Sequence, residues 1–288
     1  MIKITAIKTG TARIKSAQRT GKEGRGAIGR KIDIFRDAQW LDPLPILCFL
    51  IEHREGRFLV DTGDTWRNSV PGYLPRWNPF FTREVQIKVA PSEEVGAQLV
   101  AMGLDPARHI DAVILTHLHH DHAGGLDHFP HSRIVVARTN YEASRSLSGM
   151  FQGCLPQRWP MWLTPELVDL DTASEGPFDH VHPITADGRV FLVPTPGHAR
   201  GHASVVVRDD NVTYFIAGDA SYNEENLRRE RTDGVTYDPE VSLDTLRRIK
   251  AFALGEPTVF LPAHDPQSVE RLLSLRTFAG SPPGQPPE

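Results

Sequence analysis

Side chains that bind metals follow a short apolar run in this sequence, and this feature restricts the fold most strongly. Four of them follow the apolar residues 112–115 within a few positions: His117, His119, Asp121 and His122. Side chains two positions apart share one face of a strand, so His117 and His119 would point to the same side where the strand ends. Gly124 and Gly125 allow a tight turn beside them. The sequence therefore predicts two imidazoles that converge at a strand end, with a second pair of ligands in the turn.

The same context recurs further along the chain. Each of three more residues of the ligand type follows a predicted strand: His198, Asp219 and His264. Imidazole and carboxylate together suit zinc, iron, manganese or cobalt, with bonds of about 2.0–2.2 Å for zinc. The alternatives are a solvated His-rich loop or core histidines that hydrogen-bond to the backbone. Because the context recurs, the sequence favours a metal site.

Short apolar runs alternate with helical patterns, which indicates a mixed α/β architecture. Strands are predicted at residues 2–7, 46–52, 57–61, 112–115, 134–137, 190–193, 203–207, 213–217 and 258–261. Helices are predicted after Ser92, after the Asp-Pro-Glu at 238–240, whose Asp caps the helix, and over 267–275. No internal repeat or central linker is found. We therefore expect one domain over residues 1–278 and a disordered, Pro- and Gly-rich tail over 279–288.

Charge and apolar run length disfavour several kinds of partner. The chain carries 32 Lys and Arg against 36 Asp and Glu, a net charge of −4, which offers no general attraction for nucleic acid or anionic lipid. The apolar stretch 44–51 is far shorter than the roughly 20 residues that span a bilayer. The amino terminus does not look like a signal peptide. We therefore expect no nucleic-acid partner, no membrane association and a cytoplasmic location. The two cysteines, Cys48 and Cys154, are expected to be reduced, buried thiols.

The combined ligand pattern resembles that of the metallo-β-lactamase superfamily. The set His-x-His-x-Asp-His, followed by a lone His, a lone Asp and a final His, is highly specific, and the resemblance covers almost the whole chain before the tail. It implies an α/β fold, a four-layer αββα sandwich with a dinuclear site between the two sheets. It also implies the ligands: His117, His119 and His198 for one metal, Asp121, His122 and His264 for the other, and Asp219 as a bridge.

Two divalent ions about 3.5–4 Å apart can share a water, lower its pKa and polarise a carbonyl, so hydrolysis is the expected reaction. Zinc is the favoured metal, and iron, manganese or cobalt are alternatives. His120 and His202 match no ligand position, so we expect His202 to support the site and His120 to line the pocket or face solvent. Asp61, in an Asp-Thr-Gly sequence, resembles an early aspartate of the superfamily with a structural or ligand-orienting role.

Within the superfamily, several segments look like the N-acyl homoserine lactonases, which quench quorum signals. These segments are residues 44–48, 61–63, 138–143, 218–226 and 238–240. Tyr222 matches the lactonase tyrosine that donates a hydrogen bond near the lactone, where it would stabilise charge as a metal-bridging hydroxide opens the ring. A Tyr222 that only packs over its turn is the alternative. Asp121 could pass a proton to the departing alkoxide.

Two aromatic-rich segments are candidates for the acyl pocket. Residues 66–81 and 150–162 could pack on the core, form a homodimer contact or line an apolar ligand site. Packing or dimerisation is favoured for the first, whereas the second stays open between these roles. It supplies the predicted substrate-binding side chains: Phe151, Trp159, Met161 and Trp162. The basic segment 13–31 is expected to be an ordered arm, a dimer contact or a segment that is disordered until bound.

Other functions on the same fold are alternatives. A different lactonase, a phosphodiesterase or a thioesterase of the glyoxalase II type would use the same centre, but glyoxalase II adds a C-terminal helical region and few residues follow His264 here. Exported β-lactamases fit less well because no signal peptide is recognised, and tRNA-processing members fit less well because the overall acidity does not support a nucleic-acid-binding arm. A non-hydrolytic iron protein or a binding module is a weaker alternative, because every ligand position is filled.

Overall fold

A computed structural model describes residues 2–170 and 173–280. Its strands form two sheets, in the orders β4-β1-β2-β3-β5-β6-β7 and β13-β12-β11-β10-β9-β8. The first sheet contains β1 (Lys3–Ile14), β2 (Leu44–His53), β3 (Gly56–Val60), β4 (Val85–Lys88), β5 (Ala112–Leu115), β6 (Arg133–Ala137) and β7 (Glu166–Val168). The second contains β8 (Ala173–Glu175), β9 (Phe178–Pro183), β10 (Val190–Pro194), β11 (Ala203–Arg208), β12 (Thr213–Gly218) and β13 (Thr258–Pro262).

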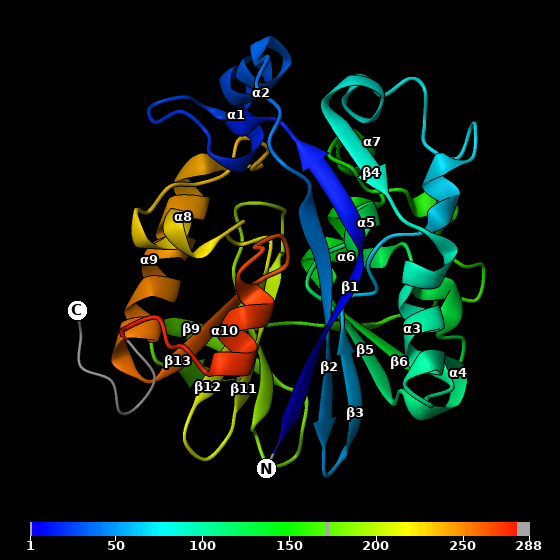
Figure 1. Ribbon diagram of the computed structural model, residues 1–288. Coiled ribbons are helices and arrows are strands. Elements are labelled where there is room, and N and C mark those ends of the chain that lie inside the picture. The colour runs from blue at the N-terminus through cyan, green and yellow to red at the C-terminus, as the bar shows by residue number, and fades with distance from the viewer. Residues whose placement is uncertain (1, 171–172, 281–288) are drawn as a thin grey trace.

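Helices cover the outer faces of both sheets, so that Figure 1 shows four layers. The helices are α1 (Ser16–Arg19), α2 (Ala27–Arg36), α3 (Val95–Ala101), α4 (Pro106–His109), α5 (His120–Ala123), α6 (Arg138–Ser144), α7 (Leu147–Phe151), α8 (Glu224–Arg228), α9 (Pro239–Gly255) and α10 (Ser268–Ser274). The predicted αββα fold class is confirmed. No helix in the described ranges is long and apolar enough to cross a membrane.

Alternation along the strands builds this layered core. In β2, Leu47, Phe49 and Ile51 pack against the second sheet, whereas Cys48 and Leu50 pack against the side covered by α3. Successive side chains of a strand point to opposite faces, so a central strand covered on both sides must be apolar throughout. This explains why the strands that carry the ligand positions read as short continuous apolar runs.

Helix α9 closes the outer face of the second sheet. The Asp238 carboxylate accepts hydrogen bonds from the backbone N–H groups of Glu240 and Val241, and Pro239 takes the first helical position, as predicted. Buried apolar side chains of α9, including Leu246 and Ile249, recur every three to four residues and pack on the sheet.

All nine predicted strands are present, although β1 extends to Ile14. The sequence reasoning missed β4, β7, β8 and β9, because these strands are short or carry mostly polar residues. The predicted helix after Ser92 begins at Val95, since residues 91–93 form a 3-10 turn. Cys48 and Cys154 are buried free thiols, as predicted.

The first two residues of the predicted disordered tail are ordered in the structure. Ala279 and Gly280 belong to an ordered turn, in which the Thr277 hydroxyl donates to the Gly280 carbonyl at 2.9 Å. This hydrogen bond holds the beginning of the segment against the domain. The rest of the predicted tail, from residue 281 on, lies outside the described residues.

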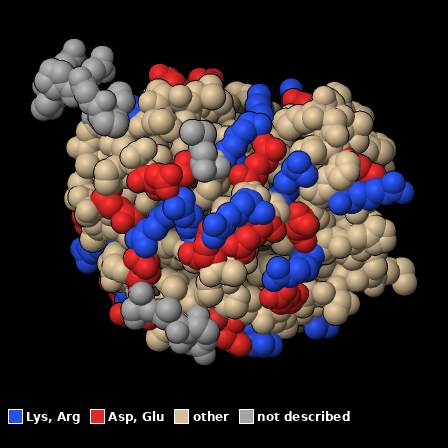
Figure 2. Space-filling model, turned by 90° about the horizontal axis from the view of Figure 1, so that it is seen from below, with Lys and Arg blue, Asp and Glu red and all other residues tan. Residues whose placement is uncertain are grey.

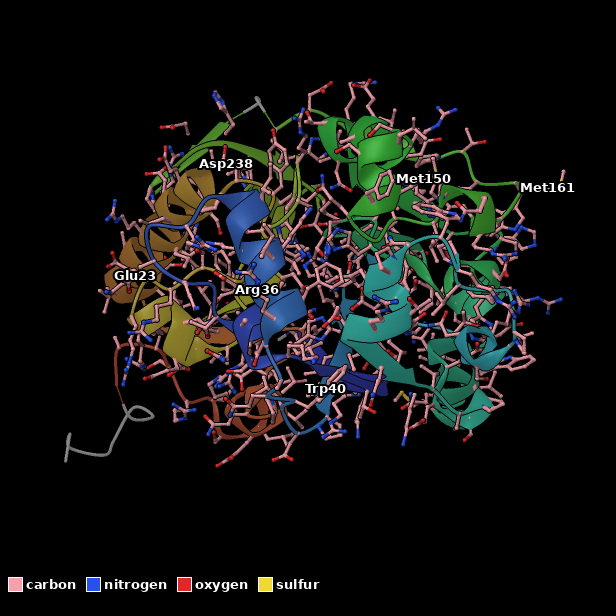
Figure 3. The ribbon with its side chains drawn as sticks, turned by 90° about the horizontal axis from the view of Figure 1, so that it is seen from above. Glu23, Arg36, Trp40, Met150, Met161 and Asp238 are labelled. Carbon is pink, nitrogen blue, oxygen red and sulfur yellow. The ribbon has the colours of Figure 1, made fainter. Side chains whose placement is uncertain are left out.

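The basic segment 13–31 is an ordered arm, the first of the three alternatives left open by the sequence, and is not disordered. It contains the end of β1, all of α1 and the start of α2. Arg30 is buried and donates to the Asp233 carbonyl at 2.8 Å, while Lys15 donates to the Asp37 carbonyl at 2.7 Å. Figure 3 shows the arm, which includes Glu23 and is followed by Arg36, on the face seen from above. These buried hydrogen bonds fix the arm in spite of its polar composition.

The opposite face carries charges of both signs. Figure 2 shows Lys and Arg next to Asp and Glu over this surface, without a large patch of either sign. Elsewhere in the first sheet, the ion pair Lys3–Glu52, at 2.6 Å, links the neighbouring strands β1 and β2. Exposed pairs of this kind contribute little to stability.

Candidate metal centre

Each predicted ligand lies just after a strand, and the fold brings these strand ends together. His117 and His119 follow β5, and Asp121 and His122 lie in the short helix α5. The others follow the strands of the second sheet: His198 after β10, Asp219 after β12 and His264 after β13. The two sheets thus contribute to one buried polar cluster at their edge.

The first group of ligand atoms consists of three imidazoles. His117 Nε2 lies 3.0 Å from His119 Nδ1, which lies 3.1 Å from His198 Nε2. Nitrogen ligands of a tetrahedral zinc, bonded at about 2.0–2.1 Å, are about 3.3 Å apart, so these separations are close to those around one ion. Burial lowers the pKa of His117 and of His119 well below the usual value, with neighbouring histidines acting in the same direction. Neutral imidazole is the form that binds metal.

The second group adds carboxylates. His264 Nε2 lies 3.4 Å from Asp121 Oδ2, and both His264 Nε2 and His122 Nε2 lie 3.3 Å from Asp219 Oδ1. The other oxygen of this aspartate, Asp219 Oδ2, lies 3.4 Å from His198 Nε2. One carboxylate of Asp219 therefore faces both groups of ligands.

The negative charge of the aspartates and the unpaired buried atoms show that the cluster fits cations. Burial opposes protonation of His264, but Asp219 and Asp121 raise its pKa to about 10. Two buried atoms that face the cluster, His122 Nε2 and Asp219 Oδ1, have no hydrogen-bond partner among the described residues. Buried polar atoms are nearly always paired. Each set of ligand atoms also lies within 4.8 Å, so the geometry and the donor types fit metal ions.

Asp61 supports the cluster through contacts with His122 and Thr116. Its carboxylate lies 2.8 Å from His122 Nδ1 and accepts hydrogen bonds from the backbone N–H and the hydroxyl of Thr116, at 2.8 and 2.9 Å. Its φ of 60° places it in the left-handed region, which Asp tolerates better than most residues. Asp61 therefore orients His122 and links the loop after β3 to the end of β5.

Other ligand histidines have supports of their own. His264 Nδ1 lies 2.9 Å from the carbonyl of Pro45, and His198 Nδ1 lies 3.3 Å from Asp233 Oδ2. Such partners hold the ring orientation of a ligating histidine. The sequence reasoning missed Asp233, because it is distant from His198 along the chain and belongs to no recognisable motif.

The two histidines outside the ligand pattern have different surroundings. His202 is fully buried between the Thr195 hydroxyl, 2.8 Å from its Nδ1, and the backbone N–H of Asp219, which donates to its Nε2 at 3.2 Å. It supports the loop that carries Asp219. His120 pairs with Asp64 at 2.9 Å and lines the cavity beside the cluster.

Replacing Asp61 with Asn should weaken metal binding by about 10- to 100-fold, the usual cost of losing an outer partner of a ligand. Asn keeps the shape but removes the charge next to His122 and presents an amide donor to Thr116 or to His122. Competition with a chromophoric chelator measures the affinity. Asp64→Asn is the matched control, since Asp64 pairs with His120 and with no member of the ligand groups. Equal affinities in the two variants would contradict the orienting role of Asp61.

A cavity opens onto the cluster. Asp121, Asp219 and Tyr222 are among its polar lining residues. The ring of Tyr222 lies 5.4 Å from that of His264, and burial raises the pKa of the phenol well above its usual value. The remaining lining includes an apolar part made of Ala12, Ile14, Leu44, Phe80, Phe81, Val85 and Val235, most of which pack with Tyr222 in one cluster.

The side chains predicted to bind the acyl group do not line this cavity. Phe151 packs edge-on against Trp77 at 5.0 Å, and Trp159 stacks on Tyr141 at 5.7 Å. Met161 is fully exposed and lies at the outer edge of the molecule in Figure 3, and Trp162 is also exposed. Within this segment, Gln152 and Gly153 reach the cavity. The apolar lining comes instead from the end of β1, the start of β2, the helical turn Phe80–Glu84, the start of β4 and Val235.

Known proteins are similar to this chain in sequence and in fold. The curated relatives include N-acyl homoserine lactonase AiiA of Bacillus thuringiensis subsp. kurstaki, 29% identical over 82% of this chain and 86% of the relative. They also include N-acyl homoserine lactonase AttM of Agrobacterium fabrum, 24% identical over 78% of this chain and 83% of the relative.

Solved structures agree with the fold. An N-acyl homoserine lactone hydrolase with N-hexanoyl-L-homoserine bound at its catalytic metal centre superposes with a TM-score of 0.72 at 23% identity, covering 93% of this chain and 94% of the other. The dizinc quorum-quenching lactonase AidC gives 0.60 at 15% identity, covering 92% and 88%. The sequence model described as metallo-beta-lactamase superfamily matches residues 41–264, a range that begins before β2 and ends on the last ligand histidine. Since that match takes in all the clustered ligand positions, the chain belongs to the metallo-beta-lactamase superfamily.

Proposed function

We propose that this protein is a metal-dependent hydrolase that opens the lactone ring of N-acyl homoserine lactones. The cavity carries this proposal, because it joins the buried ligand cluster and Tyr222 to an apolar wall. A ligand with a polar ring and an aliphatic chain matches these two surfaces. The names of the curated relatives support the same substrate class.

Two divalent ions would occupy the cluster. His117, His119 and His198 would hold one, Asp121, His122 and His264 would hold the other, and Asp219 would bridge them. The mixed imidazole and carboxylate set favours zinc, with iron, manganese or cobalt as alternatives. Bound there, the ions would make water nucleophilic at neutral pH and polarise the lactone carbonyl.

Tyr222 would stabilise the charge that develops on the carbonyl oxygen. Its raised pKa keeps the hydroxyl protonated, so the O–H can donate a hydrogen bond to that oxygen. The Tyr222 ring also lies 5.8 Å from the His198 ring, which places it between ligands of both groups. A hydrogen-bond donor at this position acts where the substrate carbonyl meets the cluster.

Asp121 would move the proton. Burial raises the pKa of Asp121, but the opposite effect of His122, His120 and His264 is larger. The net pKa is lowered, so the carboxylate is ionised. It can accept a proton from the attacking water as the new C–O bond forms. When the ring C–O bond breaks, the same proton passes to the departing alkoxide, which becomes the hydroxyl of the product.

Proton release on mixing metal-loaded protein with short- and long-chain N-acyl homoserine lactones tests this function. We expect turnover by the native protein, none by His117→Ala, and a loss of about 10²- to 10³-fold in kcat for Tyr222→Phe, the usual effect of removing one such donor. Tyr214→Phe is the matched control, because Tyr214 is a buried tyrosine in the core between the sheets. A protein with two bound metals that opens none of these lactones would refute the substrate, and thioesters and other lactones would then be tested.

Three sequence-based expectations accompany this proposal and stay predictions. They are a single domain over residues 1–278, a homodimer as one possible assembly, and a cytoplasmic location. Size-exclusion chromatography with light scattering measures the assembly directly.

A further inference from the structure

Gln18 in the arm has a buried carbonyl oxygen without a partner. Its side chain lines the same cavity as Tyr222, and the residue is only 5% exposed. Gln18 Oε1 has no hydrogen-bond partner among the described residues. Leaving a buried acceptor unsatisfied is unfavourable and rare, so a polar group at this position needs an explanation.

The position of Gln18 is fixed by the backbone around it. Its N–H donates to the Lys15 carbonyl at 3.0 Å, and its carbonyl accepts from the N–H of Gly234 at 2.8 Å. The second bond ties α1 to the segment that also carries Asp233, the partner of His198. The Gln18 side chain is therefore held beside the ligand cluster and does not belong to a free loop.

The orientation of the amide follows from its contact with Tyr222. The Gln18 side chain hydrogen-bonds to Tyr222. Because Gln18 Oε1 has no partner, the amide nitrogen makes this bond, so Gln18 Nε2 faces Tyr222. The hydroxyl proton of Tyr222 stays free for a ligand, and Gln18 Oε1 is left without a donor from the protein.

Other polar side chains of the cavity outside the ligand groups already have partners. His120 pairs with Asp64 at 2.9 Å, and Gln152 Nε2 donates to the hydroxyl of Ser148 at 3.0 Å. Gln18 therefore differs from these neighbours, because it offers a buried acceptor to whatever occupies the cavity. A ligand that satisfies it must carry a hydrogen-bond donor.

We propose that Gln18 Oε1 accepts a hydrogen bond from the amide N–H of the N-acyl homoserine lactone and thereby selects for acylamino lactones. This inference rests on the proposed function. A simple N-acyl homoserine lactone has one hydrogen-bond donor, the amide N–H, on the ring carbon next to the carbonyl. With the Tyr222 hydroxyl donating to the carbonyl oxygen, the neighbouring Gln18 is placed to receive this N–H. The acyl chain then continues towards the apolar wall that includes Ile14 and Phe81.

Two substrates, one with and one without the amide, distinguish recognition of the amide by Gln18 from a general structural role of this residue. N-hexanoyl homoserine lactone contains the amide, whereas 2-hexyl-γ-butyrolactone has the same ring and a similar chain without it. For Gln18→Leu we expect kcat/KM to fall about 10-fold for the first lactone and to change little for the second. Gln152→Leu removes an amide that is already paired, so the ratio between the two lactones should keep its native value.

Binding gives a second readout that does not depend on turnover. Calorimetry with the two ring-opened products should show about 10-fold weaker binding of N-hexanoyl homoserine to Gln18→Leu, and unchanged binding of the product without the amide. Equal losses for both ligands, or no loss for either, would overturn the role of Gln18. So would a native protein that binds neither product. Absence of turnover by the native protein, with amide-dependent binding retained, would refute the proposed lactonase activity and leave the Gln18 assignment standing.

Discussion

Replacing Asp219 with Ala should lower both the hydrolytic activity and the metal content of the purified protein. The loss of activity should exceed roughly 10²-fold, which is the most that losing a hydrogen-bond partner of a metal ligand usually costs. The Asp219 carboxylate has one oxygen 3.3 Å from His122 and His264, and the other 3.4 Å from His198. Its removal takes a negative charge away from both groups of ligands. Two cations held close together repel each other, and a shared carboxylate offsets that repulsion.

Metal content per chain and kcat/KM measure the two effects. Asp209→Ala is the matched control, because Asp209 lies in the turn before β12 and Asp219 directly follows this strand. The control should retain native metal content and activity, and circular dichroism should show that both variants are folded. An Asp219→Ala protein with native metal content and native kcat/KM would contradict the bridging role.

The ligand cluster could be predicted from sequence because its position depends on local rules. His117 and His119 are two residues apart after a strand, and this spacing fixes their common side. Asp219 and His264 follow β12 and β13, which pair in parallel with Gly218 opposite Pro262. Parallel strands end at the same edge, so residues that follow them come close together. Ligand-type residues that recur directly after strands can therefore be expected to lie close together in the fold.

The walls of the site could not be predicted in this way. The cavity depends on the arm, whose polar, Gly-containing sequence has no clear periodicity although α1 and α2 are ordered. Hydrogen bonds to residues far along the chain hold it, such as Gly21 N–H to the Thr232 carbonyl at 2.9 Å. Aromatic content alone pointed to Phe151, which packs outside against Trp77. Aromatic side chains form surface clusters as readily as pockets, so only tertiary contacts distinguish these outcomes.

Replacing Arg271 with Met should lower the free energy of unfolding by about 3–5 kcal/mol, since breaking a buried ion pair leaves an uncompensated charge in the interior. Arg271 is 0% exposed. Its guanidinium donates to Asp265 at 2.6 Å and to the Phe260 carbonyl at 2.9 Å, and it lies 3.3 Å from Glu224. Methionine fits the space but leaves Asp265 without its cationic partner, whereas Glu224 keeps Arg228 at 2.7 Å and Arg276 at 3.3 Å. Urea denaturation, with an unchanged dependence on denaturant, measures the loss.

Arg276→Met separates the effect of burial from that of charge. Arg276 also lies 3.3 Å from Glu224, but its side chain is 36% exposed, so its loss should cost about 1 kcal/mol or less. Equal costs for the two variants would contradict the role of the buried network. The network also reaches the site, because Asp265 follows His264 and accepts the N–H of Glu224, two residues after Tyr222, at 3.0 Å. If Arg271 holds both loops, Arg271→Met should weaken metal binding as well, whereas Arg276→Met should leave it unchanged.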